Sequence, residues 1–411
     1  MKKLLESIKE SLRPDFTILK KIDFVVENIN SQLKLKEIKA VCVKGGSTAK
    51  GTFLKGDYDV DLFVRFDYSL KKEFLSDLLE PVLKIIFSKI QRVHGSRDYF
   101  QTQKHDLVFE IVPVLEINDY KKALNVTDMS PLHVDYVNKK ISDKQRDDIR
   151  LAKQFCKSAK VYGAESYIKG FSGHILDLLI MNYGSFEELI KAVVDWKPKV
   201  VIDLEKHLKN PLKELDSAKT HSPLIIIDPV QPCRNAAAAL SKEKFDRFIE
   251  RCKRFLANPS EEFFKIKSIE KRTIRKKLLP NEEMFFITTT PLEGKKDVVG
   301  AKIMKVYEYL KINIKKKGFT ITNTDWEFKE KGLIYFIVKK EKLSEIEIFT
   351  GPPLKEKEGI KRFKEKHVKI FEENDRIYAE EKRKYRKAKE LIKDLLKNEY
   401  VKERVKKIKL F

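Results

Sequence analysis

The stretch KGGSTAKGTFLKGDYDVDLFVRF, residues 44–66, combines a Gly-Gly-Ser turn with two aspartates at the start of an apolar run. Apolar and polar side chains alternate over residues 58–66, which predicts a β-strand. Side chains two residues apart in a strand share a face, so we expect Asp59 and Asp61 about 6–7 Å apart along the backbone. Two carboxylates at that separation repel each other unless a cation lies between them. The pair therefore indicates a divalent metal site.

Mg²⁺ is the expected ion, because it takes oxygen ligands and keeps open positions for phosphate oxygens. A two-ion site would activate an attacking hydroxyl with one ion and hold a triphosphate with the other. The turn before the aspartates fits this chemistry. Gly46 lets the backbone approach a phosphate closely, and the Ser47 hydroxyl can donate a hydrogen bond to it.

A third carboxylate is expected on an adjacent strand. In HDLVFEIVPVLEI, Asp106 and Glu110 share one face of a strand predicted over about 106–114, which Pro113 ends. Glu110 is closer to the end of the strand, where sites tend to form, so we prefer it to Asp106. We accordingly predict Asp59, Asp61 and Glu110 as catalytic and metal-binding residues.

Composition indicates the class of partner. The 411 residues include 86 Lys+Arg and 62 Asp+Glu, a formal net charge of +24. Such an excess favours a polyanion, above all nucleic acid, through counterion release. The structural alternative is a lysine-rich chain that is simply soluble or adapted to heat. The sequence has no apolar run of about 18 residues, so it predicts no membrane span. Its four cysteines include no CxxC pair, which favours a reducing cytoplasm.

The predicted fold class is a multi-domain α/β and α+β chain. Residues 1–135 read as an α/β domain that holds the predicted catalytic acids, and 136–260 as a mainly helical domain with a short strand near 223–230. Residues 261–355 read as a ferredoxin-like or RRM-like α+β body. Residues 356–411 carry a basic excess interleaved with apolar residues, which predicts a tail of amphipathic helices.

Four blocks carry a resemblance to a known family. They are GGSTAKGTFLKGDYDVDLFVRF, FEIVPV, YGAESYIKGFSGHILDLLIMNYGSF and IIIDPVQPCRNAAAALS, followed more weakly by GPPL at 351–354. The first two are similar to the nucleotidyltransferase superfamily that includes DNA polymerase β. Together and in this order, the blocks resemble the archaeal class I CCA-adding enzymes, the tRNA nucleotidyltransferases. The likeness covers most of the chain up to about residue 265.

The resemblance implies roles for individual residues. It makes Asp59, Asp61 and Glu110 the metal carboxylates, although Glu110 stands where an aspartate is usual. It places His133, Lys153 and Tyr162 at the incoming triphosphate and Arg234 at the incoming base, whereas ordinary exposed or packing roles are the alternatives. The complete nucleotide-binding set is Gly46, Ser47, Lys50, His133, Lys153, Tyr162 and Arg234. We interpret FSGHILDLLIMNYGSF as buried helix packing, and expect Asp228 and Asn235 to organise the loop around Arg234.

The resemblance also implies a reaction and its partners. The tRNA 3′-hydroxyl attacks the α-phosphate of CTP or ATP, pyrophosphate leaves, and C, C and A are added without a template. The basic C-terminal region is expected to bind the acceptor stem and T-arm by shape. Rival functions are a poly(A)-type or oligoadenylate-type polymerase, an A-only or CC-only enzyme, and a catalytically silent RNA-binding protein. The sequence leaves the oligomeric state open, a homodimer included.

Overall fold

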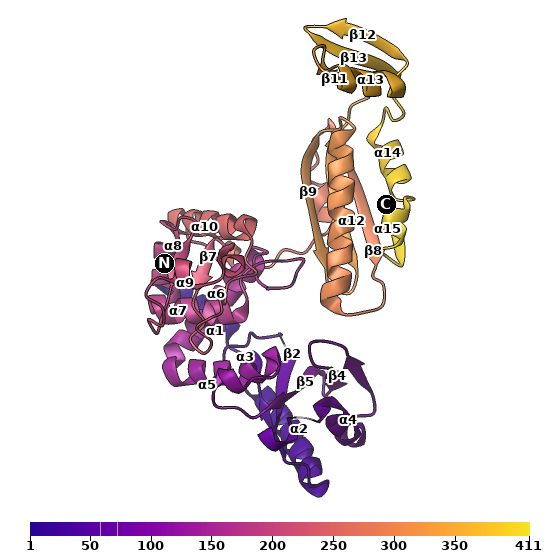
Figure 1. The fold of residues 1–411 in the computed structure, drawn as a ribbon. Coiled ribbons are helices and arrows are strands. Elements are labelled where there is room, and N and C mark those ends of the chain that lie inside the picture. Colours follow the sequence, from indigo (N-terminus) through magenta and orange to yellow (C-terminus); the bar gives the residue numbers. More distant parts are fainter. Residues whose placement is uncertain (58, 72) are drawn as a thin grey trace. The chain divides into compact units, whose positions relative to one another are not determined.

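The computed structural model describes residues 1–57, 59–71 and 73–411 of the chain. It divides into two compact units, Met1–Lys267 and Ser268–Phe411, which are described separately (Figure 1). Mixed helices and sheets in both units confirm the predicted multi-domain α/β and α+β class. The finer division into four domains remains a proposal. Among the described helices, none is long and apolar enough to cross a bilayer.

A five-stranded sheet with the order β1-β2-β5-β4-β3 forms the first part of the first unit. Strands β2 and β5 pair in parallel, and the other neighbours are antiparallel. Apolar side chains of α2 and α4 cover one face of the sheet at helical spacing. The elements are α2 (Thr17–Leu35), β1 (Ala40–Lys44), α3 (Gly46–Ala49), β2 (Asp59–Phe66), α4 (Leu75–Ile86), β3 (Ile90–Val93), β4 (Tyr99–Lys104) and β5 (Leu107–Leu115).

Alternation along β2 decides where the acids lie. Val60, Leu62 and Val64 are buried in the core beneath α2 and α4. Asp59 and Asp61 therefore lie on the opposite face, as the sequence predicts. That face is covered only in part, by residues that include Val134 of α5 (Ser130–Lys140). The sheet thus leaves room for a site beside the acids.

Helices form a second core in the first unit, in agreement with the helical period of the sequence. They surround a parallel pair of short strands, β6 and β7. The elements are α6 (Asp143–Ser158), α7 (Gly173–Tyr183), α8 (Phe186–Val193), β6 (Val200–Ile202), α9 (Pro211–Glu214), β7 (Leu224–Ile226) and α10 (Lys242–Ala257).

The N-terminal helix α1 (Lys2–Leu12) belongs to this second core, although the sequence prediction counts it with the catalytic domain. Leu5 and Ile8 are buried there, and Lys9 forms an ion pair with Asp148 of α6 over 3.2 Å. A contact between residues about 140 positions apart leaves no local signal in a sequence. The first twelve residues are therefore reassigned to the helical core.

A four-stranded antiparallel sheet, β14-β8-β10-β9, is the core of the second unit. Helix α12 packs along one face of this sheet (Figure 1). The elements are α11 (Lys271–Arg275), β8 (Glu282–Thr290), α12 (Lys296–Lys316), β9 (Ile321–Phe328), β10 (Gly332–Lys339), α14 (Ala388–Leu395), α15 (Glu399–Lys402) and β14 (Lys407–Leu410). The strand–helix–strand–strand order confirms the α+β body that the sequence predicts.

The tail over 356–411 is not helical throughout, contrary to the prediction. It holds α13 (Lys357–Lys366), β12 (Lys369–Glu373) and β13 (Arg376–Lys382) before α14, and β14 at its end. Strands β12 and β13 form a hairpin whose two turn residues, Asn374 and Asp375, have φ of 47° and 57°. An Asn-Asp turn of this kind favours a hairpin. The many lysines and glutamates obscure the alternation of apolar and polar side chains that would have predicted its strands.

The end of the chain also returns to the body. Strand β14 pairs with β8, while β11 (Ile346–Pro353) joins β13 in a separate three-stranded sheet. Val401 and Val405 are buried in the same core as α12. The basic tail is thus part of the folded second unit rather than an appendage.

Candidate active site

Asp61 and Glu110 are neighbours across the parallel pair β2 and β5. In the register of the two strands, Asp61 faces Glu110 and Asp59 faces Val108. The prediction that Glu110 lies on a strand adjacent to the aspartate pair is therefore confirmed. The roles of the three acids in catalysis remain a prediction.

The Gly-Gly-Ser turn is hydrogen-bonded to Asp61 and packs closely against it. Gly45 donates its backbone N–H to the Asp61 carbonyl over 2.8 Å. Gly46 has φ of +50°, and a Cβ atom at this position would lie 1.8 Å from Asp61 Oδ2. The second glycine is therefore required to make room for the carboxylate, in addition to the left-handed backbone that favours glycine.

Like charges crowd this face of the sheet. Burial raises the pKa of Asp61 to about 6, and the negative charges of Glu110 and Asp59 add to the rise, whereas Lys50 opposes it. A cation beside these carboxylates would relieve the repulsion, and a donor set made only of oxygens suits a hard divalent metal. The acids thus fit a divalent metal in chemistry and in charge.

The raised pKa predicts how stability depends on pH in metal-free protein. A carboxyl group whose folded-state pKa exceeds its unfolded value costs stability when ionised, and that cost disappears as the pH falls through about 6 towards 3.8. We expect Asp61→Asn to raise the melting temperature at pH 8 in EDTA, because it removes a cost of roughly 3 kcal/mol. At pH 5 the gain should shrink. An equal gain at both pH values, measured by differential scanning calorimetry, would contradict the assignment.

Glu110 is hydrogen-bonded to β4, which neighbours β5 on the side away from β2. Gln101 of β4 lies directly opposite it in the antiparallel register and donates from Nε2 to Glu110 Oε1 over 2.6 Å. Among the hydrogen bonds of the described residues, none engages the second carboxylate oxygen of Glu110. This contact holds the Glu110 side chain in place.

A cavity of about 700 Å³ opens beside Asp61. Four predicted nucleotide-binding residues, Gly46, Lys50, His133 and Arg234, line it. Of the described residues predicted for this role, Ser47, Lys153 and Tyr162 lie outside the lining set. The lining is completed by Phe63, Val126, Thr127, Met129, Ser130, Val134, His174 and Gln231.

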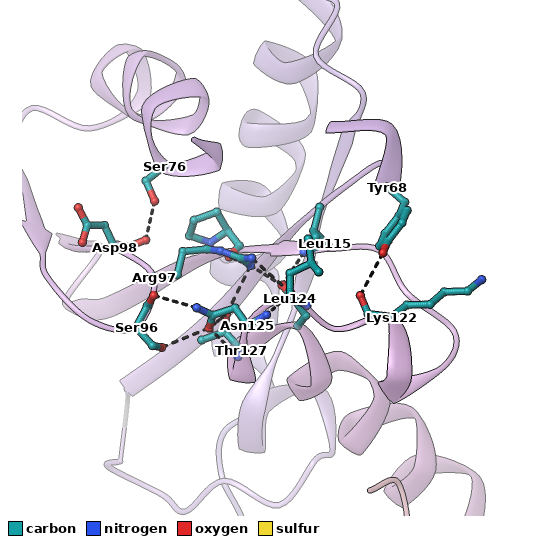
Figure 2. Close-up of polar contacts among 12 residues, drawn as sticks. Tyr68, Ser76, Ser96, Arg97, Asp98, Leu115, Lys122, Leu124, Asn125 and Thr127 are labelled. Atoms are coloured by element: carbon teal, nitrogen blue, oxygen red, sulfur yellow. Dashed lines mark hydrogen bonds and ion pairs between the residues drawn. The ribbon is translucent and has the colours of Figure 1, made fainter. Parts of the chain in front are cut away.

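One wall of the cavity is anchored by a buried aspartate. Asp128 is fully buried, forms an ion pair with Arg97, and accepts the backbone N–H groups of Leu115, Leu124 and Asn125 over 2.9–3.1 Å. Figure 2 shows Arg97 reaching from its own loop towards this turn. These bonds hold the short segment 126–130 that faces the cavity.

Three charged residues meet behind the cavity. Asp177 of α7 is fully buried and forms an ion pair with Lys50. Lys153 of α6 donates from Nζ to the carbonyl and hydroxyl oxygens of Thr52 over 2.9 and 3.0 Å, and burial lowers its pKa to about 8. A Cβ atom on Gly173 would lie 3.2 Å from the Tyr162 hydroxyl. Lys153 and Tyr162 therefore both lie close to the start of α7, next to His174 in the chain.

The interpretation of FSGHILDLLIMNYGSF as packing alone is wrong for two residues. His174 lines the cavity and Asp177 pairs with Lys50, whereas the apolar residues of α7 are buried as expected. A histidine and an aspartate three residues apart in an otherwise apolar helix share one face. That spacing was the signal in the sequence.

Asp228 joins two of the predicted residues. His133 and Arg234 both donate to its carboxylate, at 2.8 and 2.7 Å. Within the described part of the chain, His133, His174 and Asp228 are the one set of three potential metal ligands whose atoms lie within 4.8 Å of one another. The guanidinium of Arg234 already neutralises Asp228, so we interpret the set as a polar cluster rather than a metal site. Of the two histidines, His133 is hydrogen-bonded to Asp228, whereas His174 Nε2 lies 3.9 Å from Asp228 Oδ2.

Models of three protein families match the chain. The nucleotidyltransferase domain matches residues 25–162, the second domain of tRNA nucleotidyltransferases matches 147–265, and the C-terminal domain of CCA-adding enzymes matches 290–407. Two solved structures share the fold at 14% identity: an RNA terminal U-transferase with a TM-score of 0.51 and the Cid1 poly(U) polymerase with 0.52. They match 65% and 64% of this chain and 98% of their own.

Curated relatives match over nearly the whole chain. The CCA-adding enzyme of Nanoarchaeum equitans is 37% identical over 82% of this chain and 82% of its own. That of Methanocaldococcus jannaschii is 33% identical over 85% and 80%, and that of Methanothermobacter thermautotrophicus is 29% identical over 95% and 87%. With three matching domain models in the same order, the chain belongs to the family of archaeal CCA-adding enzymes, the tRNA nucleotidyltransferases.

Proposed function

We propose that Asp59, Asp61 and Glu110 transfer nucleotides from CTP and ATP to the tRNA 3′ end within the cavity beside β2. The chain is a CCA tRNA nucleotidyltransferase, which adds C, C and A without a template. One observation carries the assignment of the site: Asp61 and Glu110 face each other in register, and Asp61 borders a cavity lined by four of the residues predicted to bind nucleotide.

Divalent metal ions are general cofactors of the nucleotidyltransferase superfamily. We propose Mg²⁺ at a two-ion site on the three carboxylates, where the bound metal would activate the tRNA hydroxyl and stabilise the departing pyrophosphate. The acids themselves supply negative charge at fixed positions, since β2 and β5 hold Asp61 and Glu110 in register. Most of the rate enhancement should come from this positioning.

We propose that different residues of the cavity contact the triphosphate and the base of the nucleotide. Gly46 and Lys50 line the cavity together with Asp61 and are proposed to contact the triphosphate, as are Ser47 and His133. Lys153 and Tyr162 are proposed to act on the triphosphate from the wall behind Lys50 and His174. Arg234 is proposed to read the base, because a guanidinium can meet acceptors of both cytosine and adenine.

CCA-adding enzymes act on tRNA with nucleoside triphosphates. We propose that the second unit binds the acceptor stem and T-arm through phosphates and 2′-hydroxyls. Residues 355–411 hold 21 Lys+Arg against 12 Asp+Glu, and the lysines of α13 and of the strands that follow are mostly exposed. Deleting the tail would remove β14 from the body sheet, so charge-neutralising substitutions are the suitable test of this proposal.

Two minor proposals concern the setting of the protein. Free cysteines at Cys42, Cys156 and Cys252 are buried, and Cys233 is exposed, which favours a reducing cytoplasm. A homodimer remains a prediction, and the molar mass of the protein in solution would test it.

Product length tests the proposed reaction. The protein is incubated with Mg²⁺ and tRNA transcripts that lack the last three nucleotides, with CTP, ATP, both, or UTP, and the products are sequenced. We expect two additions from CTP alone, three additions that then stop from CTP and ATP together, and little incorporation of UTP. Long homopolymer tails would support a poly(A)-type or uridylyl-type enzyme, and an A-only or CC-only product would support a partial enzyme.

A further inference from the structure

Asp228 follows β7 and is fully buried, yet it is bonded to two residues that line the cavity. Its Oδ1 accepts the backbone N–H groups of Val230 and Gln231 over 3.0 and 3.2 Å, and its Oδ2 accepts Arg234 Nη1 over 2.7 Å. His133 of α5 donates from Nε2 to both oxygens over 2.9 and 2.8 Å. Five bonds therefore converge on one carboxylate.

The two carboxylate oxygens of Asp228 have different structural roles. Oδ1 closes the turn that follows β7, where an asparagine oxygen would serve equally well. Oδ2 holds the side chain of Arg234, which is 44% exposed and otherwise projects from its loop. A long, half-exposed arginine loses considerable rotamer freedom when it is held in one position. The buried charge thus fixes a flexible side chain before any ligand arrives.

The bonds also bridge distant parts of the chain. His133 and Arg234 are about 100 residues apart in sequence, on a helix and on a loop, and only Asp228 is bonded to both side chains among the contacts of the described residues. Because both line the same cavity, their relative orientation sets the shape that a ligand meets.

We propose that Asp228 is a positioning residue that aligns Arg234 and His133 for the incoming nucleotide, and so sets the affinity for CTP and ATP. The inference rests on the proposed function of this cavity. It assigns Asp228 no contact with the substrate, because its carboxylate is fully buried and its lone pairs are engaged by protein donors.

Asp228→Asn separates the two tasks. With the amide oxygen at the Oδ1 position the turn keeps its acceptor, whereas the amide NH₂ replaces Oδ2 and meets the Arg234 guanidinium donor to donor. We expect the KM for CTP and for ATP to rise about tenfold, the value of one charge-assisted hydrogen bond, with a much smaller change in kcat. CTP affinity measured by calorimetry should fall by the same factor, while the melting temperature stays close to wild type.

A double-mutant cycle with Arg234→Ala shows whether Asp228 acts through Arg234. In the Arg234→Ala background, Asp228→Asn should add little to KM, because the guanidinium is gone and the amide oxygen at the Oδ1 position still accepts His133 Nε2. Asp203→Asn is the matched control, since Asp203 accepts the Leu208 N–H over 2.9 Å in the loop after β6 and lies outside the cavity lining. If Asp228→Asn does not fold, Asp228→Glu takes its place in the same cycle, because it keeps the charge but displaces the carboxylate.

The outcomes separate the inference from the proposed function. If Arg234→Ala leaves KM unchanged, the role of Arg234 in the proposed site is wrong. If Arg234→Ala raises KM but Asp228→Asn leaves it unchanged, the inference alone is overturned. An equal rise in KM from Asp228→Asn with and without Arg234 would also overturn it, because the effect would then come from the fold of the loop.

Discussion

Replacing Asp61 by asparagine is expected to lower the rate of nucleotide addition by about 1,000-fold or more, because the substitution removes a metal-binding charge from the centre of the site. Asp61 faces Glu110 across β2 and β5 and touches the glycine turn at the cavity. Single-turnover incorporation of labelled CTP measures the effect. Asp59→Asn should behave similarly, since it removes the second charge of the pair.

Asp106→Asn is the matched control for this experiment. Asp106 is a carboxylate from the same predicted strand segment, but it lies in the turn between β4 and β5 with φ of 64° and is exposed. We expect near wild-type incorporation from this variant. If Asp61→Asn retains wild-type rates, or if Asp106→Asn matches its loss, the assignment of the acids is wrong.

Replacing Asp128 by alanine is expected to lower the free energy of unfolding by about 3–5 kcal/mol, the cost of breaking a buried ion pair. The substitution leaves the largely buried guanidinium of Arg97 without its ion-pair partner and three backbone N–H groups without their acceptor. Denaturant unfolding, followed by the fluorescence or circular dichroism of the full chain, measures the change. We also expect the segment 126–130, which forms one wall of the cavity, to lose its fixed conformation.

Asp119→Ala is the control for Asp128. Asp119 is an exposed aspartate nearby that accepts one backbone N–H, from Lys121 over 2.9 Å. Losing such a cap costs about 1 kcal/mol or less. Equal losses from the two variants would mean that Asp128 does not anchor this wall.

Much of the catalytic sheet could be predicted because its signals are local. Alternation in DVDLFVRF gives β2 and the face of its aspartates, and the acid before Ile-Val-Pro gives the position of Glu110. The second glycine of the turn was predicted for a different reason. The sequence suggested a close approach to phosphate, whereas the structure shows Gly46 making room for the carboxylate of Asp61.

The features that the sequence missed depend on long-range contacts. Strand β14 pairs with β8 across more than 100 residues, and α1 packs in the second core. His174 lines the cavity and Asp177 pairs with Lys50 behind it, yet both belong to α7, a mostly apolar helix that the sequence alone assigns to packing. Asp228 was expected to organise its own loop, but its bond to His133 could be seen only once α5 and β7 were brought together.

A crystal structure of the protein with Mn²⁺ and CTP tests the central claim most directly, because the anomalous signal of manganese locates the metal independently of activity. We predict manganese on the carboxylates of Asp59, Asp61 and Glu110, and CTP in the cavity with its base towards Arg234. Manganese on His133, His174 and Asp228 instead, or CTP bound outside this cavity, would contradict the account.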